Sequence, residues 1–247
     1  MERRPEISGP DGVGTNSPDQ DATLPIAFGG HAFVADRTGA LYWPVERTLI
    51  VADLHLEKGS AFAARGRLLP PYDTRETLQR LGEVIGRFQP ARVLALGDSL
   101  HDRGAAARID AVDLVLLAAL QKGRDWLWIK GNHDPEIAPV FAGRVAGWLE
   151  IAGIRLQHEP ASETAAPEIA GHLHPTARLV NRGVTLRRRC FVADRQRLIL
   201  PAFGAFTGGL NVRDAAFRPL FDAESMRVWM LGADGVYPVP PAQLASD

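Results

Sequence analysis

The chain has 247 residues, of which 46% are apolar and 23% are charged, a composition that can bury a substantial core. Its formal net charge of −1 excludes a global attraction to nucleic acid, so such a partner would need a local basic patch. The single cysteine excludes a disulfide framework and no apolar run is long enough to span a membrane, so we expect a cytoplasmic protein without a membrane partner.

Composition divides the chain into three parts. Residues 1–22 are rich in Gly, Pro, Asp and Ser, which predicts a disordered tail. Residues 23–240 are globular in composition, without repeats or an obvious linker, and we expect them to form a single domain. The last residues, 241–247, are expected to be flexible.

Strands and helices alternate in the first half of the domain. Short apolar runs predict buried strands at 48–53, 92–98, 126–132 and 154–158. Apolar residues at helical spacing predict a helix over 73–88, capped by Asp73 and Glu76, and another over 106–123. Residues 176–240 are typical of short strands joined by turns. We therefore predict an α/β fold with two sheets packed face to face and helices outside.

Polar clusters follow the predicted strands. The first strand ends in DLH, the second in GDSLHD, the third in GNHD and the fourth in a lone histidine, after which comes GHLH. One histidine pair alone is more often structural. Here the carboxyl ends of the strands, where α/β sheets bind ligands, collect six of the seven histidines: His55, His101, His133, His158, His172 and His174.

These residue types predict a binuclear metal site. Imidazole, carboxylate and amide oxygen suit manganese, iron, zinc or nickel. Seven such candidate ligands are too many for one tetrahedral site with an open position. They suit two divalent ions that share a bridging carboxylate, an arrangement that clamps phosphorus for in-line attack.

The five blocks, in this order, resemble the calcineurin-like metallophosphoesterase superfamily. The resemblance implies a four-layer αββα sandwich of two mixed sheets flanked by helices. It also implies that Asp98 bridges two metals and that His133 lies beside the scissile phosphate, where it stabilises charge or protonates the leaving group. The remaining implied ligands are Asp53, His55 and His174 for the first metal and Asn132, His158 and His172 for the second.

The third residue after Asp98 separates branches of the superfamily. Phosphoprotein phosphatases have Asp there, whereas nuclease subunits of double-strand-break repair often have His, as this chain does at His101. The resemblance favours a nuclease in which His101 orients His133. The alternative is that Asp102 orients His133 and His101 only packs.

A narrower likeness covers about residues 26–215. The segments at 40–59, 64–81 and 184–209, with the GHLHP block, resemble the bacterial ligase-associated DNA-damage-response endonuclease family. This resemblance implies a manganese-dependent single-strand DNA endonuclease in DNA repair, a homodimer, and a functional link to a DNA ligase and a helicase. One departure is Glu57, where we expect glycine, and it puts the geometry of Lys58 in doubt.

Basic residues supply candidate contacts to a phosphate backbone. Six arginines fall within residues 182–197, and strand alternation places Arg187 and Arg189 on one face. Lys58 and Arg65, after the first metal block, form a second candidate patch. The alternative is that both groups are ordinary solvated surface. Clustered aromatic residues of the kind that stack on single strands are absent.

Two other functions fit the same blocks. One is a metallophosphoesterase that acts on a small molecule, such as a cyclic nucleotide or a phosphomonoester. The other is a metal-stabilised DNA-binding module without turnover. The sequence shows no obvious cap insertion between the blocks, since the spacings are short, which favours an open site and a polymeric substrate.

Overall fold

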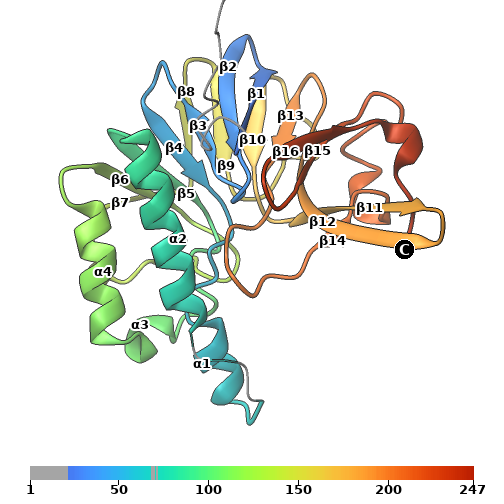
Figure 1. Ribbon diagram of the computed structural model, residues 1–247. Coiled ribbons are helices and arrows are strands. Elements are labelled where there is room, and N and C mark those ends of the chain that lie inside the picture. Colours follow the sequence, from blue (N-terminus) through green and yellow to red (C-terminus); the bar gives the residue numbers. More distant parts are fainter. Residues whose placement is uncertain (1–21, 68–69, 71) are drawn as a thin grey trace, which may run out of the picture.

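Two mixed sheets pack face to face in the computed structural model, which describes residues 22–67, 70 and 72–247 (Figure 1). The predicted fold class is confirmed. The expected N-terminal tail lies outside the described residues, except for Ala22. Among the described residues, no helix is long and apolar enough to cross a membrane.

The first sheet has seven strands in sequential order. Its first four strands pair antiparallel and its last four pair parallel. The first three were not identified from the sequence. The strands are β1 (Thr23–Phe28), β2 (His31–Asp36), β3 (Leu41–Trp43), β4 (Thr48–Val51), β5 (Arg92–Leu96), β6 (Asp125–Ile129) and β7 (Arg144–Ala146).

The second sheet runs in the order β14-β11-β12-β13-β10-β9-β8, and β15 and β16 extend it from β12. Within it, β9, β10 and β13 are parallel. Its strands are β8 (Trp148–Ile151), β9 (Ile154–Gln157), β10 (Glu168–Ala170), β11 (Pro175–Asn181), β12 (Val184–Ala193), β13 (Arg197–Ile199), β14 (Leu210–Asn211), β15 (Arg227–Leu231) and β16 (Val236–Val239).

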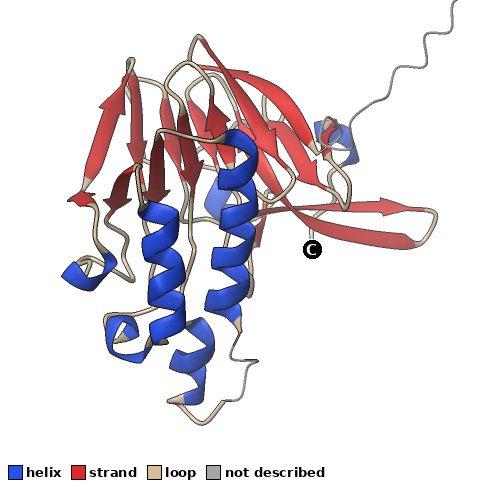
Figure 2. Ribbon diagram, turned by 60° about the vertical axis from the view of Figure 1, so that its left-hand side comes forward, coloured by secondary structure: helices blue, strands red, loops and turns tan. Residues whose placement is uncertain are grey.

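Alternating side chains of β4 build two separate cores. Ile50 points into the core between the two sheets, while Leu49 and Val51 point to the opposite face. There they pack under helices that include α2 (Asp73–Phe88) and α4 (Ala111–Gln121). Figure 2 shows the two long helices side by side on one side of the strands.

Helix α2 has the predicted bounds, but its predicted cap is wrong. Its N-cap residue is Tyr72, and the Asp73 carboxylate instead accepts a hydrogen bond from the Gly59 N–H (3.1 Å), at the start of α1 (Lys58–Ala63). The predicted second helix is two helices, α3 (Ala105–Arg108) and α4. The chain turns at Asp110, whose side chain accepts from the Val112 N–H and caps α4.

The outer face of the second sheet is covered mainly by irregular chain. Val212, Phe217, Phe221 and Met226 pack there, around the short 3₁₀ turn η2 (Ala215–Phe217). The C-terminal residues 241–247, which begin with η3 (Pro241–Gln243), lie against β11. Leu244 is buried and the Ala245 N–H donates to the Arg178 carbonyl oxygen.

Candidate metal centre

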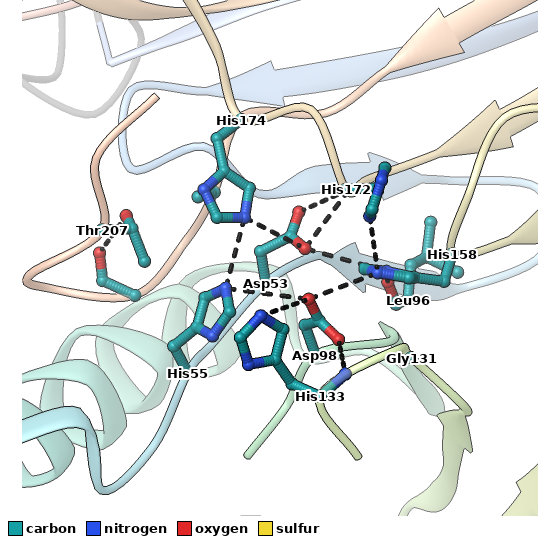
Figure 3. A network of polar contacts seen from close by, with 12 residues as sticks. Asp53, His55, Leu96, Asp98, Gly131, His133, His158, His172, His174 and Thr207 are labelled. Carbon is teal, nitrogen blue, oxygen red and sulfur yellow. Dashed lines mark hydrogen bonds and ion pairs between the residues drawn. The ribbon is translucent and has the colours of Figure 1, made fainter. Parts of the chain in front are cut away.

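The five polar blocks meet at one edge of the sandwich, where the ends of β4, β5 and β6 face the ends of β9 and β10. Figure 3 shows residues of all five blocks gathered around Asp53 and Asp98. Asp53 and Asp98 each lie two residues beyond a strand of the first sheet, and His158 directly follows β9. His172 and His174 lie in the turn between β10 and β11. All seven candidate ligands are therefore supplied by strand ends and connecting turns.

The backbone at these turns is left-handed at five of the candidate ligands. A positive φ is uncommon in residues other than glycine and costs free energy, and it concentrates at functional sites. Asp53 and His55 flank Leu54, and His172 and His174 flank Leu173. The left-handed backbone at these four residues directs their side chains into the centre. The five angles are 54° at Asp53, 45° at His55, 45° at Asp98, 71° at His172 and 47° at His174.

Three donor atoms form a tight triangle on the side of the second sheet. The Asn132 Oδ1 lies 3.0 Å from the His158 Nε2 and 3.1 Å from the His172 Nδ1, and the two nitrogens are 3.2 Å apart. Donor atoms about 2.1 Å from one ion and at right angles to each other are roughly 3.0 Å apart. The triangle therefore fits one face of an octahedral metal site.

A second group of donors lies beside the first. The Nε2 atoms of His55 and His174 are 3.2 Å apart, and the His174 Nε2 lies 3.3 Å from the Asp53 Oδ1. Between the two groups stands the buried carboxylate of Asp98. Its Oδ2 is 3.3 Å from the His158 Nε2 and 3.9 Å from the His55 Nε2, so one oxygen faces both groups.

Hydrogen bonds at the outer ring nitrogens fix two of the tautomers. The Nδ1–H groups of His158 and His174 donate to the carbonyl oxygens of Leu96 (3.0 Å) and Gly208 (3.2 Å), because a carbonyl can only accept. In the neutral form of each ring, the Nε2 then carries no proton and points into the centre. Such outer contacts orient histidine ligands in metalloproteins.

Burial and charge explain the titration of the histidines. Burial, aided by the neighbouring His174, lowers the pKa of His55 to about 2, so its ring stays neutral. Burial also opposes the charged form of His158, but its hydrogen bond to Asp98 and the charges of Asp53 and Asp98 raise its pKa to about 9. The two carboxylates thus favour a cation at the centre, and a divalent ion would displace this proton.

His133 is at the open side of the centre, with 42% of its side chain exposed. Its Nε2 lies 4.0 Å from the Asp98 Oδ2, and its Nδ1–H donates to the main-chain carbonyl oxygen of His101 (2.8 Å). The His101 ring stacks on the His133 ring, with centroids 5.5 Å apart. The Asp102 carboxylate instead binds Arg108 (2.7 Å). The hydrogen bond that holds His133 therefore comes from the backbone of residue 101.

Three glycines each face a candidate ligand from another block. A Cβ on Gly97 would lie 2.4 Å from the His158 ring, one on Gly131 would lie 2.2 Å from the Asp98 Oδ1, and one on Gly171 would lie 2.6 Å from the Asp53 Oδ2. No side chain fits at these distances. These glycines are needed for the close approach of the blocks.

Glu57 adopts a left-handed conformation, with φ 66°, which accounts for the glycine expected at this position. Its buried carboxylate accepts hydrogen bonds from the hydroxyls of Thr74 (2.9 Å) and Ser60 (2.6 Å). These bonds hold the turn before Lys58. Burial lowers the pKa of His101, and the charges of Lys58 and Arg65 lower it further, so both cations act on His101.

The two candidate arginines of β12 have different surroundings. Arg187 is exposed and donates to the Gly209 carbonyl oxygen (2.9 Å), one residue from the contact of His174. The Arg189 guanidinium donates to the Ala202 carbonyl oxygen (2.8 Å), and burial, together with the nearby Arg80, lowers its pKa to about 10.

The sequence pattern indicates no role for Asp134, the last residue of GNHD. Its buried carboxylate accepts from the N–H groups of Leu100 (3.0 Å) and Gly131 (3.0 Å), so it ties the second block to the third. Burial and the charge of Asp98 raise its pKa to about 6. Its place inside the motif was the only available signal.

The sequence pattern of the calcineurin-like phosphoesterase family matches residues 46–178, which include every candidate ligand. The chain belongs to this family and is a metal-dependent phosphoesterase. No curated protein sequence matches it.

Among solved structures, the crystal structure of the nuclease MPE of Pseudomonas putida is similar, with 33% sequence identity and a TM-score of 0.69. The match covers 88% of this chain and 100% of that one, and it fits the narrower endonuclease family. Yfce, a phosphoesterase from E. coli, matches at 14% identity with a TM-score of 0.38, over 81% of this chain and 96% of that one.

Proposed function

We propose that this protein is a manganese-dependent endonuclease that cleaves single-stranded DNA internally, in DNA repair. The observation that carries the proposal is the position of Asp98, whose Oδ2 faces the donor groups of both His55 and His158. A carboxylate between two groups of nitrogen and oxygen donors fits a bridged pair of divalent ions. The similarity to a nuclease supports a nucleic-acid substrate.

Each side chain has a proposed role. Asp53, His55 and His174 hold one divalent ion, Asn132, His158 and His172 hold the other, and Asp98 holds both. When bound, the ions supply the nucleophile-activating and charge-neutralising chemistry of a two-metal phosphodiesterase. His133 gives a proton from Nε2 to the sugar oxygen that leaves phosphorus. His101 positions that ring through its carbonyl oxygen and its stacked ring.

The basic residues near the centre are proposed to bind the DNA backbone. Lys58 and Arg65 lie on the side of His101, and Arg187 lies beyond His174. Arg189 extends this surface less, because its guanidinium is partly buried and donates to the main chain. The exposure of His133 leaves the centre accessible to a long strand.

The narrower family resemblance extends the proposal to the cellular setting. It supports a homodimer and a functional link to a DNA ligase and a helicase. The single cysteine, Cys190, supports a reducing cytoplasm as the compartment.

The test is cleavage of circular single-stranded DNA by chelator-stripped protein, with and without manganese. A closed circle has no ends, so linear products that need manganese establish internal cleavage. The Asp98→Ala variant, purified identically, controls for a contaminating nuclease. An intact circle, with rapid hydrolysis of a small phosphodiester or monoester by the same preparation, would overturn the proposal in favour of a small-molecule phosphoesterase.

A further inference from the structure

A groove of about 380 Å³ continues from the metal centre along the edge of the sandwich. Its lining includes Asn132 and His158, two of the candidate ligands. It also includes Lys130, after β6, and Trp148 and Arg155, on β8 and β9. The groove therefore follows the line along which the chain crosses from the first sheet to the second.

Trp148 is the exposed member of the five tryptophans. Its side chain is 52% exposed, whereas Trp43, Trp126, Trp128 and Trp229 are at most 9% exposed. It begins β8, the terminal strand of the second sheet, and so lies at the rim of the groove. Trp148 pairs with Gln157, the residue before His158, so the exposed ring lies close to the candidate metal centre.

The Trp148 ring is held in place by a chain of polar contacts. The Arg155 guanidinium lies over the ring, 4.6 Å from its centroid, and its Nε donates to the Gln157 Oε1 (2.7 Å). Gln157 in turn donates to the buried Glu168 (2.7 Å), which pairs with the buried Arg197. The arginine and the ring are thereby ordered before any ligand arrives, which lowers the entropic cost of binding.

The charges along the groove suit a nucleic-acid strand. Lys130 and Arg155 supply two cations, and Glu159 is the carboxylate among the lining residues. Proteins that bind single strands combine such cations with an aromatic ring on which a base stacks. A base within a duplex is already stacked on both faces and is not available to such a ring.

We propose that Trp148 is a stacking platform for one base of the single strand being cleaved, with Lys130 and Arg155 contacting the adjoining phosphates. The inference rests on the proposed nuclease function and adds a basis for selecting single strands over duplex. Every base has an aromatic face, so the platform accepts any sequence.

The test compares two substrates in the native protein and four variants. The substrates are a fluorescent oligo-dT 20-mer and bis(p-nitrophenyl) phosphate, a diester without a base. We expect Trp148→Ala and Trp148→Leu to lower the ratio of kcat/KM for the oligonucleotide to that for the small diester by about tenfold or more. Trp148→Phe, which keeps an aromatic ring, should retain most of the ratio. Tyr237→Ala, which removes an aromatic residue that is 51% exposed on β16, should leave the ratio unchanged.

A second measurement needs no variant. In oligonucleotides with one abasic position, the native protein should cut poorly at the phosphate that lies a fixed number of nucleotides from the abasic position. Uniform cutting, or an unchanged substrate ratio in Trp148→Ala and Trp148→Leu, would overturn the platform and leave the nuclease proposal standing. Hydrolysis of the small diester by the native protein, without any cleavage of DNA, would instead overturn the nuclease proposal and the platform with it.

Discussion

The main-chain carbonyl oxygen of His101 lies 2.8 Å from the Nδ1 of His133 and holds the exposed ring toward Asp98. A backbone contact survives a change of side chain. The sequence motif alone suggests a contact between side chains. In the structure the contact is to the backbone, and kinetics of side-chain variants can test this.

His133→Ala removes the proposed proton donor and should lower kcat by about 10² to 10⁴ while leaving the metal content intact. His101→Ala keeps the carbonyl oxygen and loses only the stacked ring, so its loss of kcat should be at least about tenfold smaller. Steady-state kinetics and elemental analysis of the two variants check this. Equal losses would show that the His101 ring itself acts on His133.

Removal of metal should lower the thermal stability. The buried carboxylates of Asp53 and Asp98 both lie close to the His158 ring, at 3.7 and 3.3 Å, so their negative charges are concentrated at the centre. A bound cation offsets this charge. A ligand at one hundred times its Kd stabilises a protein by about 2.7 kcal/mol. For a chain of this size that corresponds to a rise in Tm of roughly 5–10 °C. Differential scanning calorimetry of stripped protein with added manganese measures it, and Asp98→Asn should show a much smaller rise.

Glu57 allows conformational strain to be separated from hydrogen bonding. Glu57→Ala loses the bonds to Ser60 and Thr74 and keeps a β-carbon at positive φ, so it should destabilise the fold. Glu57→Gly loses the same bonds but adopts this backbone freely, and it should be about 1 kcal/mol more stable than the alanine variant. Urea denaturation of both variants provides the comparison. An alanine variant as stable as the glycine variant would contradict this account.

Burial raises the pKa of the Cys190 thiol well above its usual range. A raised pKa means less thiolate at any given pH, and only the thiolate reacts with disulfide reagents. At pH 8 the native protein should therefore react negligibly with Ellman's reagent, and the denatured protein should release one equivalent. Rapid reaction of the native protein would show that β12 opens locally.

The sequence predicted which residues lie at the centre better than how they are held. Strand ends could be located because apolar runs stop at Asp53, Asp98 and His158, and parallel strands bring their carboxyl ends to one edge. The left-handed turns could not be predicted, because Asp and His do not ordinarily adopt a positive φ. The roles of these residues in metal binding and catalysis remain predictions.

Other features depended on contacts distant in sequence. The cap of α2 was misassigned because Asp73 binds the Gly59 N–H, and no local pattern reveals that partner. Trp148 was overlooked because a single tryptophan carries no signal until its exposure is known.

The close approach of glycines to ligands from other blocks has a consequence for how the protein folds. Gly97 follows β5 of the first sheet and lies against the ring of His158, which follows β9 of the second. Gly171 follows β10 of the second sheet and lies against the carboxylate of Asp53, which follows β4 of the first. Neither sheet alone can assemble the complete set of donors. High-affinity metal capture should consequently be a late event in folding. The appearance of bound metal during refolding would time the docking of one sheet onto the other.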